Sequence, residues 1–345
     1  MRGFAARATV MILALASVSI PAEAGETLRR YEFAESHMGS EFKIVLYSPD
    51  APTARSASRL AFDRIAELDR SFSDYQPDSE LMRLCDKSGG PPVKVSDDLF
   101  EILVQSKAMY ERSEGAFDVT VGPVVRLWRR ARRERKLPSA ENLEHAKRLV
   151  SSDFMTLDRG TQTVTLAKAG MKLDLGAIAK GYACDAALKV LKERGISRCL
   201  VAGAGDIGVA EPPPDAVGWV VGIAPLENPE SAPERQLLLK NVAVSTSGDT
   251  ERFVEINGKR YSHIVDPKTG LGKVDRASVT IIAKDGTTAD ALATAVYGLG
   301  PERGLRLVEA TEGAAAYIVR ATETGKSVVE SKRFREFPKA EKKGK

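Results

Sequence analysis

Apolar residues fall three and four positions apart in four stretches of the chain, at 60–68, 99–109, 178–191 and 289–298. This spacing predicts four helices, each of which buries one face. Ser96 stands before the second stretch, where a serine side chain caps the first turn of a helix. Gly195 follows the third stretch and predicts the end of that helix. We expect the fourth stretch to form the last helix of the chain.

Elsewhere apolar and polar positions alternate, or short apolar runs occur, as in β-strands. The expected strands are at 42–47, 163–166, 171–175, 199–201, 219–223, 242–245, 253–256 and 277–283, and a final hairpin spans 315–330. A turn at Ala169-Gly170 should pair 171–175 back onto 163–166. Asn257-Gly258 predicts a second tight turn, because both residues readily adopt positive φ angles. Hairpins combined with a few long helices indicate an α+β fold with a mixed or antiparallel sheet.

The first 24 residues differ from the rest of the chain. Arg2 and Arg7 precede an apolar run at 8–20, and Ala22-Glu23-Ala24 has the small-x-small pattern of a cleavage site. We therefore expect a signal peptide at 1–24 and export to the periplasm; the alternative is a segment that is not cleaved and serves as an anchor. The run is shorter than the roughly 20 residues of a membrane-spanning helix, and no later stretch reaches that length. No cysteine follows the cleavage site directly, so we expect a soluble protein and not a lipoprotein.

The composition indicates a soluble globular protein and excludes a disordered or fibrous one. Apolar residues make up 43% of the 345 residues, and the formal net charge is +4. We expect one domain at 25–335 and a basic, disordered tail at 336–345. The one basic concentration, 126–136, contains a single aromatic residue, so we interpret it as a solvated face and expect no nucleic acid partner. Three scattered cysteines are too few for a disulfide framework or a tetrahedral zinc site.

A glycine-rich segment at 203–208 matches the spacing of a dinucleotide-binding fingerprint. That fingerprint must open a helix, whose N-terminal amides hold the pyrophosphate. Here three prolines at 212–214 follow shortly after and forbid a helix. We therefore exclude a Rossmann domain and expect a glycine-rich strand end that packs close to a ligand.

Two segments could bind a phosphate or a metal ion. Asp290 and Thr294 are four residues apart on an expected helix, so their oxygens share one face and could bind Mg²⁺. The alternative is structural: the helix dipole stabilises the Asp290 carboxylate in the first turn, and the Thr294 hydroxyl bonds to the backbone of its own helix. The small residues between Asp174 and Lys180 predict a strand-to-helix corner with open backbone amides, which either approaches a phosphate or is simply packed.

His263 follows the hairpin that turns at Asn257-Gly258, and it is one of three histidines in the chain. A histidine side chain titrates near neutral pH, so it could serve as a base or as a neutral hydrogen-bonding group. Asp266 lies three residues later at a Pro/Gly turn. The alternative is that His263 only bonds the next loop.

These segments resemble, in order, the ApbE-like FAD:protein FMN transferases. The matching pieces are Met38-Gly39-Ser40, 72–75 with Ser79-Glu80, 115–120 leading to Leu127-Trp128, 174–185, Gly205-Asp206, 246–249, 261–270 and 289–294. Each piece is short, but the ordered series covers nearly all of the mature chain.

The resemblance implies a T-fold-like α+β domain that binds FAD in an extended groove, with Mg²⁺ at the pyrophosphate. It implies an enzyme that moves FMN onto a Thr or Ser hydroxyl of an acceptor flavoprotein as a phosphoester and releases AMP. The acceptor would be an exported or membrane-associated redox protein. The alternatives are an FAD pyrophosphatase that yields FMN and AMP, and a periplasmic FAD-binding protein without catalysis.

The resemblance also implies site residues by position. The implied FAD contacts are Met38, Tyr75, Ala116, Phe117, Asp118, Asp174, Lys180 and Ile264. The implied metal site consists of Asp290, Thr294 and the backbone carbonyl of Ala177. His263 matches the histidine near the reacting phosphate, and we expect it to act as the base. Lys180 would offset phosphate charge, and Asp266 would orient His263 or compete with it.

Overall fold

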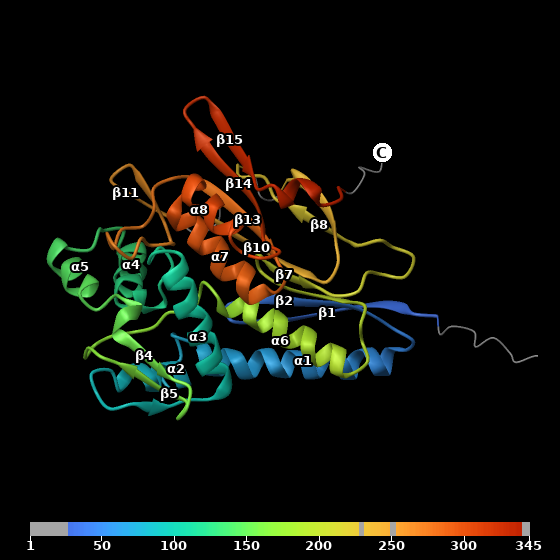
Figure 1. The fold of residues 1–345 in the computed structure, drawn as a ribbon, viewed down its shortest axis with the longest axis horizontal. Coiled ribbons are helices and arrows are strands. Elements are labelled where there is room, and N and C mark those ends of the chain that lie inside the picture. Colours follow the sequence, from blue (N-terminus) through green and yellow to red (C-terminus); the bar gives the residue numbers. More distant parts are fainter. Residues whose placement is uncertain (1–26, 228–230, 249–252, 340–345) are drawn as a thin grey trace, which may run out of the picture.

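The computed structural model describes residues 27–227, 231–248 and 253–339. At its centre lies an eight-stranded sheet in which all neighbouring strands are antiparallel (Figure 1). In spatial order the strands are β1 (Arg29–His37), β2 (Ser40–Ser48), β6 (Cys199–Gly203), β7 (Asp206–Val209), β10 (Val242–Gly248), β13 (Ala277–Ala283), β14 (Ala315–Thr322) and β15 (Gly325–Glu330). The expected signal peptide and most of the expected tail lie outside the described residues.

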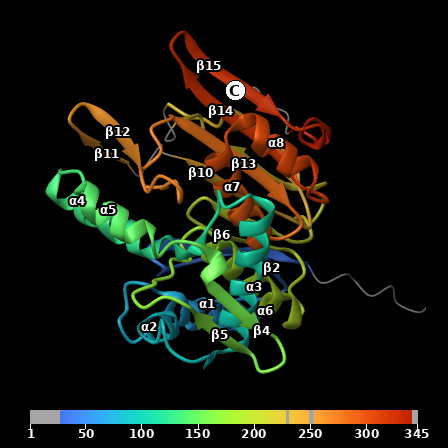
Figure 2. The same cartoon turned by 60° about the vertical axis from the view of Figure 1, so that its left-hand side comes forward.

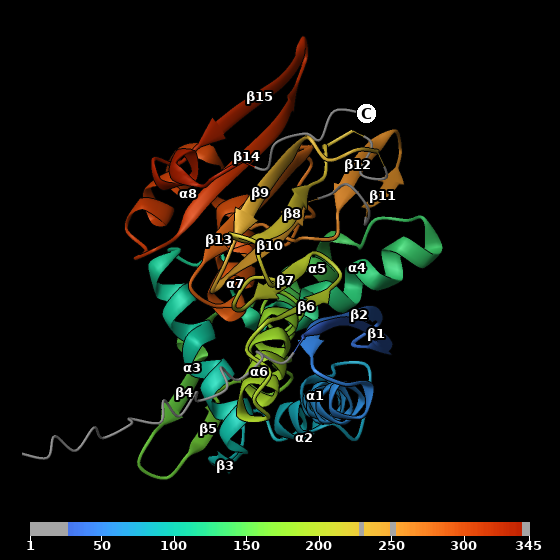
Figure 3. The ribbon, with the colours of Figure 1, turned by 90° about the vertical axis from the view of Figure 1, so that its right-hand side faces the viewer.

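Three helices cover one face of this sheet. They are α1 (Ala51–Phe72), α6 (Ala179–Glu193) and α7 (Gly286–Leu299), with α6 packed between the other two (Figure 3). The sheet buries alternate residues against them, so that Ile44 joins the helix-covered core while Val45 points to the opposite face. This alternation follows from the two-residue repeat of a strand.

A hairpin covers the opposite face. It consists of β8 (Trp219–Ile223) and β9 (Arg235–Leu239), and the short 3₁₀ helix η3 (Arg333–Glu336) packs beside it. Val221 and Leu237 of the hairpin share an apolar cluster with Val244 and Tyr317 of the sheet. The middle strands of the sheet are therefore buried on both faces, whereas the edge strands β1 and β15 stay largely exposed.

A third apolar cluster joins the basic region to the hairpin before His263. It contains α4 (Gly122–Glu134), α5 (Ala140–Lys147) and the strands β11 (Phe253–Ile256) and β12 (Lys259–Ser262) (Figure 2). The Trp128 ring of α4 lies 5.1 Å from the Tyr261 ring, centroid to centroid, and its Nε1 donates to the Gly270 carbonyl at 2.7 Å. These contacts fix the His263 segment relative to α4.

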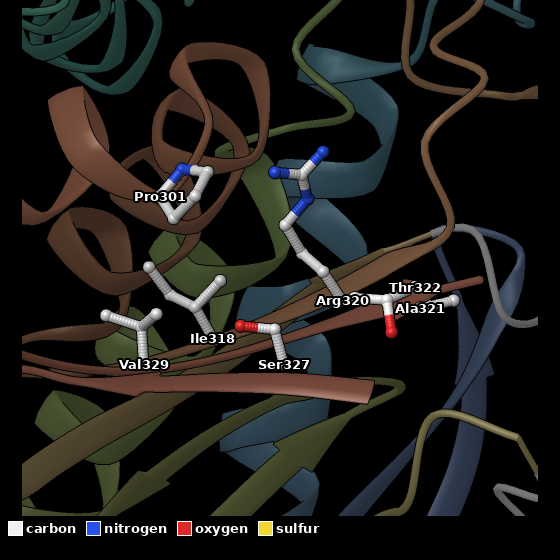
Figure 4. Close-up of a pocket in the computed structure, with 7 residues that line it drawn as sticks. All are labelled: Pro301, Ile318, Arg320, Ala321, Thr322, Ser327 and Val329. Atoms are coloured by element: carbon white, nitrogen blue, oxygen red, sulfur yellow. The ribbon is translucent and has the colours of Figure 1, made fainter. Parts of the chain in front are cut away.

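The remaining elements surround this framework. They are α2 (Glu80–Asp86), α3 (Asp97–Arg112), the 3₁₀ helices η1 (Val119–Val121) and η2 (Ser152–Phe154), the small sheet β3 (Val93–Lys94), β5 (Thr163–Leu166) and β4 (Met155–Asp158), and α8 (Pro301–Glu309). Pro301 of α8 lies over Ile318 and Val329, beside a small pocket on β14 and β15 (Figure 4). Arg320 lines this pocket, but it pairs with Asp275 at 3.3 Å.

Most of the expected elements form, and the α+β class is confirmed. Asn257 and Gly258 take positive φ angles of 54° and 71° between β11 and β12, as their sequence predicts. No helix in the described ranges is long and apolar enough to span a membrane. Glycine-rich segment 203–208 forms the turn from β6 to β7 without a following helix, as expected.

Two expectations are wrong. Segment 171–175 is not a strand, and β5 pairs instead with β3 and β4. Its alternation is real, because Met171 and Leu173 are buried, but the Leu173 N–H donates to Cys85 Sγ and the Asp174 N–H to the Val119 carbonyl. The helix at 289–298 is not the last one either, since α8 follows α7 directly. Pro301 at the start of α8 is compatible with a new helix because the first turn needs no donor there.

Candidate active site

A cavity of ≈ 580 Å³ opens at the rim of the sheet, within the size range of small-molecule sites. It is lined by α4, the corner before α6, the turn between β6 and β7, the ends of β8 and β10, the segment after β12, and α7. The sequence-predicted residues that line it are Tyr75, Ala116, Phe117, Asp118, Asp174, Ala177, Lys180, His263, Ile264, Asp290 and Thr294. Met38 and Asp266 are not among the lining residues.

Half-buried Lys180 and two buried carboxylates, Asp206 and Asp290, form one charged group in the cavity wall. Lys180 Nζ lies 2.6 Å from Asp206 Oδ2 and 3.9 Å from Asp290 Oδ2. Ser245 Oγ donates to the other Asp206 oxygen at 2.6 Å. Although burial opposes its charge, the two carboxylates raise the pKa of Lys180. Lys180 is therefore a fixed positive charge in the cavity.

Asp290 and Thr294 lie one turn apart on α7, and both line the cavity. Burial and the neighbouring Asp206 carboxylate raise the pKa of Asp290. Thr294 Oγ1 lies 3.2 Å from Ser247 Oγ at the end of β10. The Gly181 N–H donates to Asp290 Oδ2 at 3.1 Å. Among the described residues it makes no backbone hydrogen bond to the Ala177 carbonyl, which lies four residues earlier and would be its partner in an α-helix. The three residues predicted to hold a metal all line this cavity.

Asp185 fixes the start of α7 against α6. Its carboxylate accepts from the N–H groups of Gly286 and Thr287 at 2.7 and 2.9 Å, and from Thr287 Oγ1 at 2.7 Å. These amides belong to the first turn of α7, where they have no partner within the helix. Burial raises the pKa of Asp185 to about 6, even though these hydrogen bonds favour the ionised form. Asp185 therefore sets where Asp290 and Thr294 stand relative to Lys180.

His263 follows β12 in a segment held by backbone hydrogen bonds. The Ser262 N–H donates to the Lys273 carbonyl at 2.7 Å, and the Lys273 N–H donates to the Ile264 carbonyl at 3.0 Å. His263 is half-buried and lines the cavity. Asp266 lies at the following turn, where its Oδ1 accepts from the N–H groups of residues 268 and 269. This carboxylate stabilises the turn, and its effect on His263 stays a prediction.

Of the other implied FAD contacts, Ala116, Phe117 and Asp118 line the cavity, whereas Met38 does not. Ala116, Phe117 and Asp118 lie together in the wall, but the Asp118 carboxylate already accepts hydrogen bonds from Thr120 and Ser152. Burial raises its pKa. The Met38 N–H donates to Asp69 at 2.8 Å, on the turn between β1 and β2. Met38 is thus the one implied FAD contact that the structure does not bring to the cavity wall.

The predicted site set lacks six polar residues of the wall: Arg129, Arg132, Asp206, Thr246, Ser247 and Ser278. Arg129 of α4 donates to Asp74 at 2.5 Å and to Asp174 at 3.0 Å, and its guanidinium lies 4.1 Å from the centre of the Tyr75 ring. The sequence does contain a signal for it. Val125, Trp128, Arg129 and Arg132 line the cavity at positions i, i+3, i+4 and i+7, which is one helical face.

The arrangement suits a ligand with phosphate groups. The cavity combines a lysine, hard oxygen donors on α7, a histidine, and apolar walls from Ile207, Val221 and Ile223. Among the described residues there is no cluster of three or more His, Cys, Asp and Glu side chains that could hold a metal ion alone. A metal here would need hydroxyl, carbonyl and ligand oxygens in addition to the carboxylate.

Comparison with known proteins gives a consistent result. A model described as the ApbE family matches residues 38–318. The chain is 32% identical over 280 residues to the FAD:protein FMN transferase of Haemophilus influenzae, an alignment that covers 79% of this chain and 81% of the relative. It is similar in structure to the flavin transferase ApbE from Vibrio cholerae, with a TM-score of 0.82, 28% identity, and coverage of 90% and 100%. The apo form of the Pseudomonas stutzeri flavinyl transferase ApbE gives a TM-score of 0.79 at 31% identity, with coverage of 90% and 96%.

Proposed function

This chain belongs to the ApbE family, and on that premise we propose that it transfers FMN from FAD to a Thr or Ser hydroxyl of an acceptor protein and releases AMP. FMN transfer from FAD to protein is the activity for which its relatives are named. The main structural support for the proposal is that Lys180, Asp290 and Thr294 line the same cavity in this protein.

The transfer breaks the phosphoanhydride bond between the two phosphates of FAD and forms a phosphoester bond to the acceptor. The hydroxyl oxygen of the acceptor bonds to the phosphorus of the FMN half, while the bond from that phosphorus to the bridging oxygen breaks. AMP leaves with the bridging oxygen, and a base accepts the hydroxyl proton. The main obstacle is negative charge, because an electron-rich oxygen must approach an anionic phosphate while a second anion departs.

Two residues of the cavity wall can lower this barrier, Lys180 by its charge and His263 as a base. Lys180 holds a fixed positive charge, which two carboxylates keep in place and which can balance charge on a phosphate. His263 stands on a rigid segment at the same cavity and is our candidate for the base. A base positioned in this way contributes roughly 10²–10⁴-fold to a proton transfer.

The oxygen groups at α7 fit a magnesium ion. Asp290 supplies a carboxylate and Thr294 a hydroxyl, and the Ala177 carbonyl belongs to the same cavity wall. Mg²⁺ prefers oxygen ligands and takes only one or two carboxylates when phosphates complete its shell. The raised pKa of Asp290 reflects burial beside another carboxylate, which a cation would relieve. These three residues would hold Mg²⁺, which when bound would neutralise charge on the pyrophosphate.

We also propose the location and the class of partner. The pattern at 1–24 favours export to the periplasm. An acceptor that meets the enzyme there would be an exported or membrane-associated redox protein, because a covalently bound flavin serves electron transfer. Cys85, Cys184 and Cys199 are buried and unpaired, so this proposal does not depend on their redox state.

The direct test mixes the purified chain with FAD, Mg²⁺ and candidate exported redox proteins. We expect a mass increment of one FMN on a Thr or Ser of one acceptor, together with one AMP per transfer, and no increment when Mg²⁺ is omitted. Free FMN and AMP without a modified acceptor would establish the pyrophosphatase instead. Intact FAD in the presence of Mg²⁺ and an acceptor that a relative flavinylates would establish a binding protein without catalysis.

A further inference from the structure

We propose that Arg129 is a positioning residue for FAD: it fixes Tyr75 and Asp174 and offsets part of the charge of Asp174 and the neighbouring Asp74 without contacting the phosphates. This inference rests on the proposed function, because it takes FAD as the ligand. Its test, however, measures binding and does not require transfer to occur.

The geometry of Arg129 joins three separate parts of the chain. One guanidinium nitrogen, Nη1, donates to Asp74 Oδ2 at 2.5 Å, and the other, Nη2, donates to Asp174 Oδ2 at 3.0 Å. The face of the same group lies 4.1 Å from the centre of the Tyr75 ring. A planar guanidinium can make two directed hydrogen bonds and one stacking contact at once, whereas a lysine ammonium cannot.

Arg129 is unlike the other basic residues of α4. Its side chain is 24% exposed, whereas Arg126, Arg130 and Arg132 are exposed at the surface. Arg130 pairs with Glu134 on its own helix at 2.7 Å. Both terminal nitrogens of Arg129 already donate to carboxylates, so we assign its guanidinium to ordering this part of the wall and not to binding a phosphate.

The carboxylates explain why a balancing charge is needed. Asp74 and Asp174 are largely buried, with side chains 10% and 13% exposed. Charges a few ångströms apart in a partly desolvated wall interact much more strongly than in water. Of the two, only Asp174 lines the cavity. Without Arg129 it would present an unpaired carboxylate, with that of Asp74 close by, to a dinucleotide whose pyrophosphate is itself anionic. Arg129 reduces the net charge of this cluster from −2 to −1.

The stacking contact with Tyr75 accounts for an arginine, and not a lysine, at position 129. Its ring is 76% exposed, an unusual state for a large aromatic side chain that lines a cavity. The stacked guanidinium limits the orientations of the ring, which prepares it to receive a flat ring of the ligand. A ring that is ordered before binding loses less conformational entropy when the ligand arrives.

The experiment compares Arg129→Lys with Arg130→Lys, a matched change one residue away on the exposed face. FAD binding is measured by quenching of flavin fluorescence without acceptor, and KM and kcat for FAD are measured with acceptor. We expect Arg129→Lys to weaken FAD binding roughly 10- to 30-fold and to raise KM by a similar factor. The kcat at saturating FAD should change less than about threefold, since Arg129 acts through Tyr75 and Asp174. Arg130→Lys should match the wild type.

Two further variants separate the role of Arg129 from a folding defect and show how much of its effect passes through Tyr75. Should Arg129→Lys fail to fold, the double variant Asp74→Asn/Arg129→Gln keeps the net charge of the cluster at −1 while it removes the cation beneath Tyr75. It should still bind FAD more weakly than the wild type. In a Tyr75→Ala background, Arg129→Lys should cost less than it does alone, because part of its effect passes through the ring.

Unchanged FAD binding in both Arg129→Lys and the double variant would overturn the proposal. So would a loss of kcat at unchanged KM, because that pattern belongs to a residue that acts on the reacting phosphate. If the wild type binds FAD but transfers no FMN, the proposed function fails, while the binding comparison still decides the role of Arg129.

Discussion

The backbone N–H of Gly181 donates to the Asp290 carboxylate across the closest approach of α6 and α7. A side-chain carbon at Gly181 would stand 2.0 Å from the Gly286 carbonyl oxygen and 2.9 Å from the Asp290 Cβ. The helices can therefore approach this closely only because Gly181 has no side chain. This contact therefore sets the position of the Asp290 carboxylate in the cavity wall. The packing of the two helices thus affects the proposed metal site.

We predict that Gly181→Ala separates α6 from α7 and lowers both stability and transfer activity. Overpacking of this kind costs about 1–3 kcal/mol of unfolding free energy. Urea unfolding and FMN transfer at fixed Mg²⁺ measure the two effects. Gly160→Ala is the control, because a methyl group there would meet only the Asp158 carboxylate at 3.3 Å. Wild-type stability in Gly181→Ala would contradict the packing argument.

We predict that His263→Ala abolishes most transfer while FAD still binds. Loss of a general base should lower kcat by roughly 10²- to 10⁴-fold. Single-turnover transfer measures the chemical step, and quenching of flavin fluorescence measures binding. His145→Ala on α5 is the matched control, since that histidine is exposed and does not line the cavity. Unaltered turnover in His263→Ala would remove this residue from the mechanism.

Local sequence patterns predicted the parts of the site that depend on spacing. Asp290 and Thr294 are four residues apart, and the helical repeat alone places both on the face that lines the cavity. Likewise, Asn257-Gly258 determines the hairpin turn by its backbone preferences, and this turn precedes His263.

The parts that could not be predicted depend on contacts between distant segments. The alternation of 171–175 indicated burial correctly, but pairing with β5 failed because Cys85 and Val119 accept its backbone N–H groups instead. The composition of the basic run on α4 indicates a solvated face, yet Arg129 pairs with carboxylates 55 and 45 residues away in the chain. Sequence composition does not reveal which charge in a run finds a buried partner.

We predict that Thr294→Ala raises the Mg²⁺ concentration needed for half-maximal transfer at least roughly tenfold. The hydroxyl is a neutral ligand, so excess Mg²⁺ should restore much of the rate. Asp290→Asn removes a negative charge and should be rescued less completely. Titration of transfer activity with MgCl₂ measures both, and Thr322→Ala at the exposed end of β14 is the control. An unchanged Mg²⁺ requirement in both site variants would contradict the proposed metal ligands.

Asp185 should make the stability of the fold depend on pH in a defined direction. Its pKa is about 6 in the folded protein, against an ordinary value of 3.8, because burial outweighs the hydrogen bonds from Thr287 and Gly286. The folded state thus binds the proton more tightly than the unfolded chain does. The stabilisation from Asp185 is fully present below about pH 3.8 and is lost as the pH rises through about 6.

Asp185→Asn cannot ionise and so isolates this effect. The variant also loses hydrogen-bond acceptors at the start of α7, which lowers its stability by an amount that does not depend on pH. The unfolding free energy of the wild type minus that of the variant should therefore fall between about pH 4 and pH 6, by at most on the order of 3 kcal/mol, and level off above that range. Urea unfolding at half-unit pH steps from 4 to 7.5 measures this difference. A difference that rises with pH would mean that the amides of α7 stabilise the ionised carboxylate more than burial opposes it.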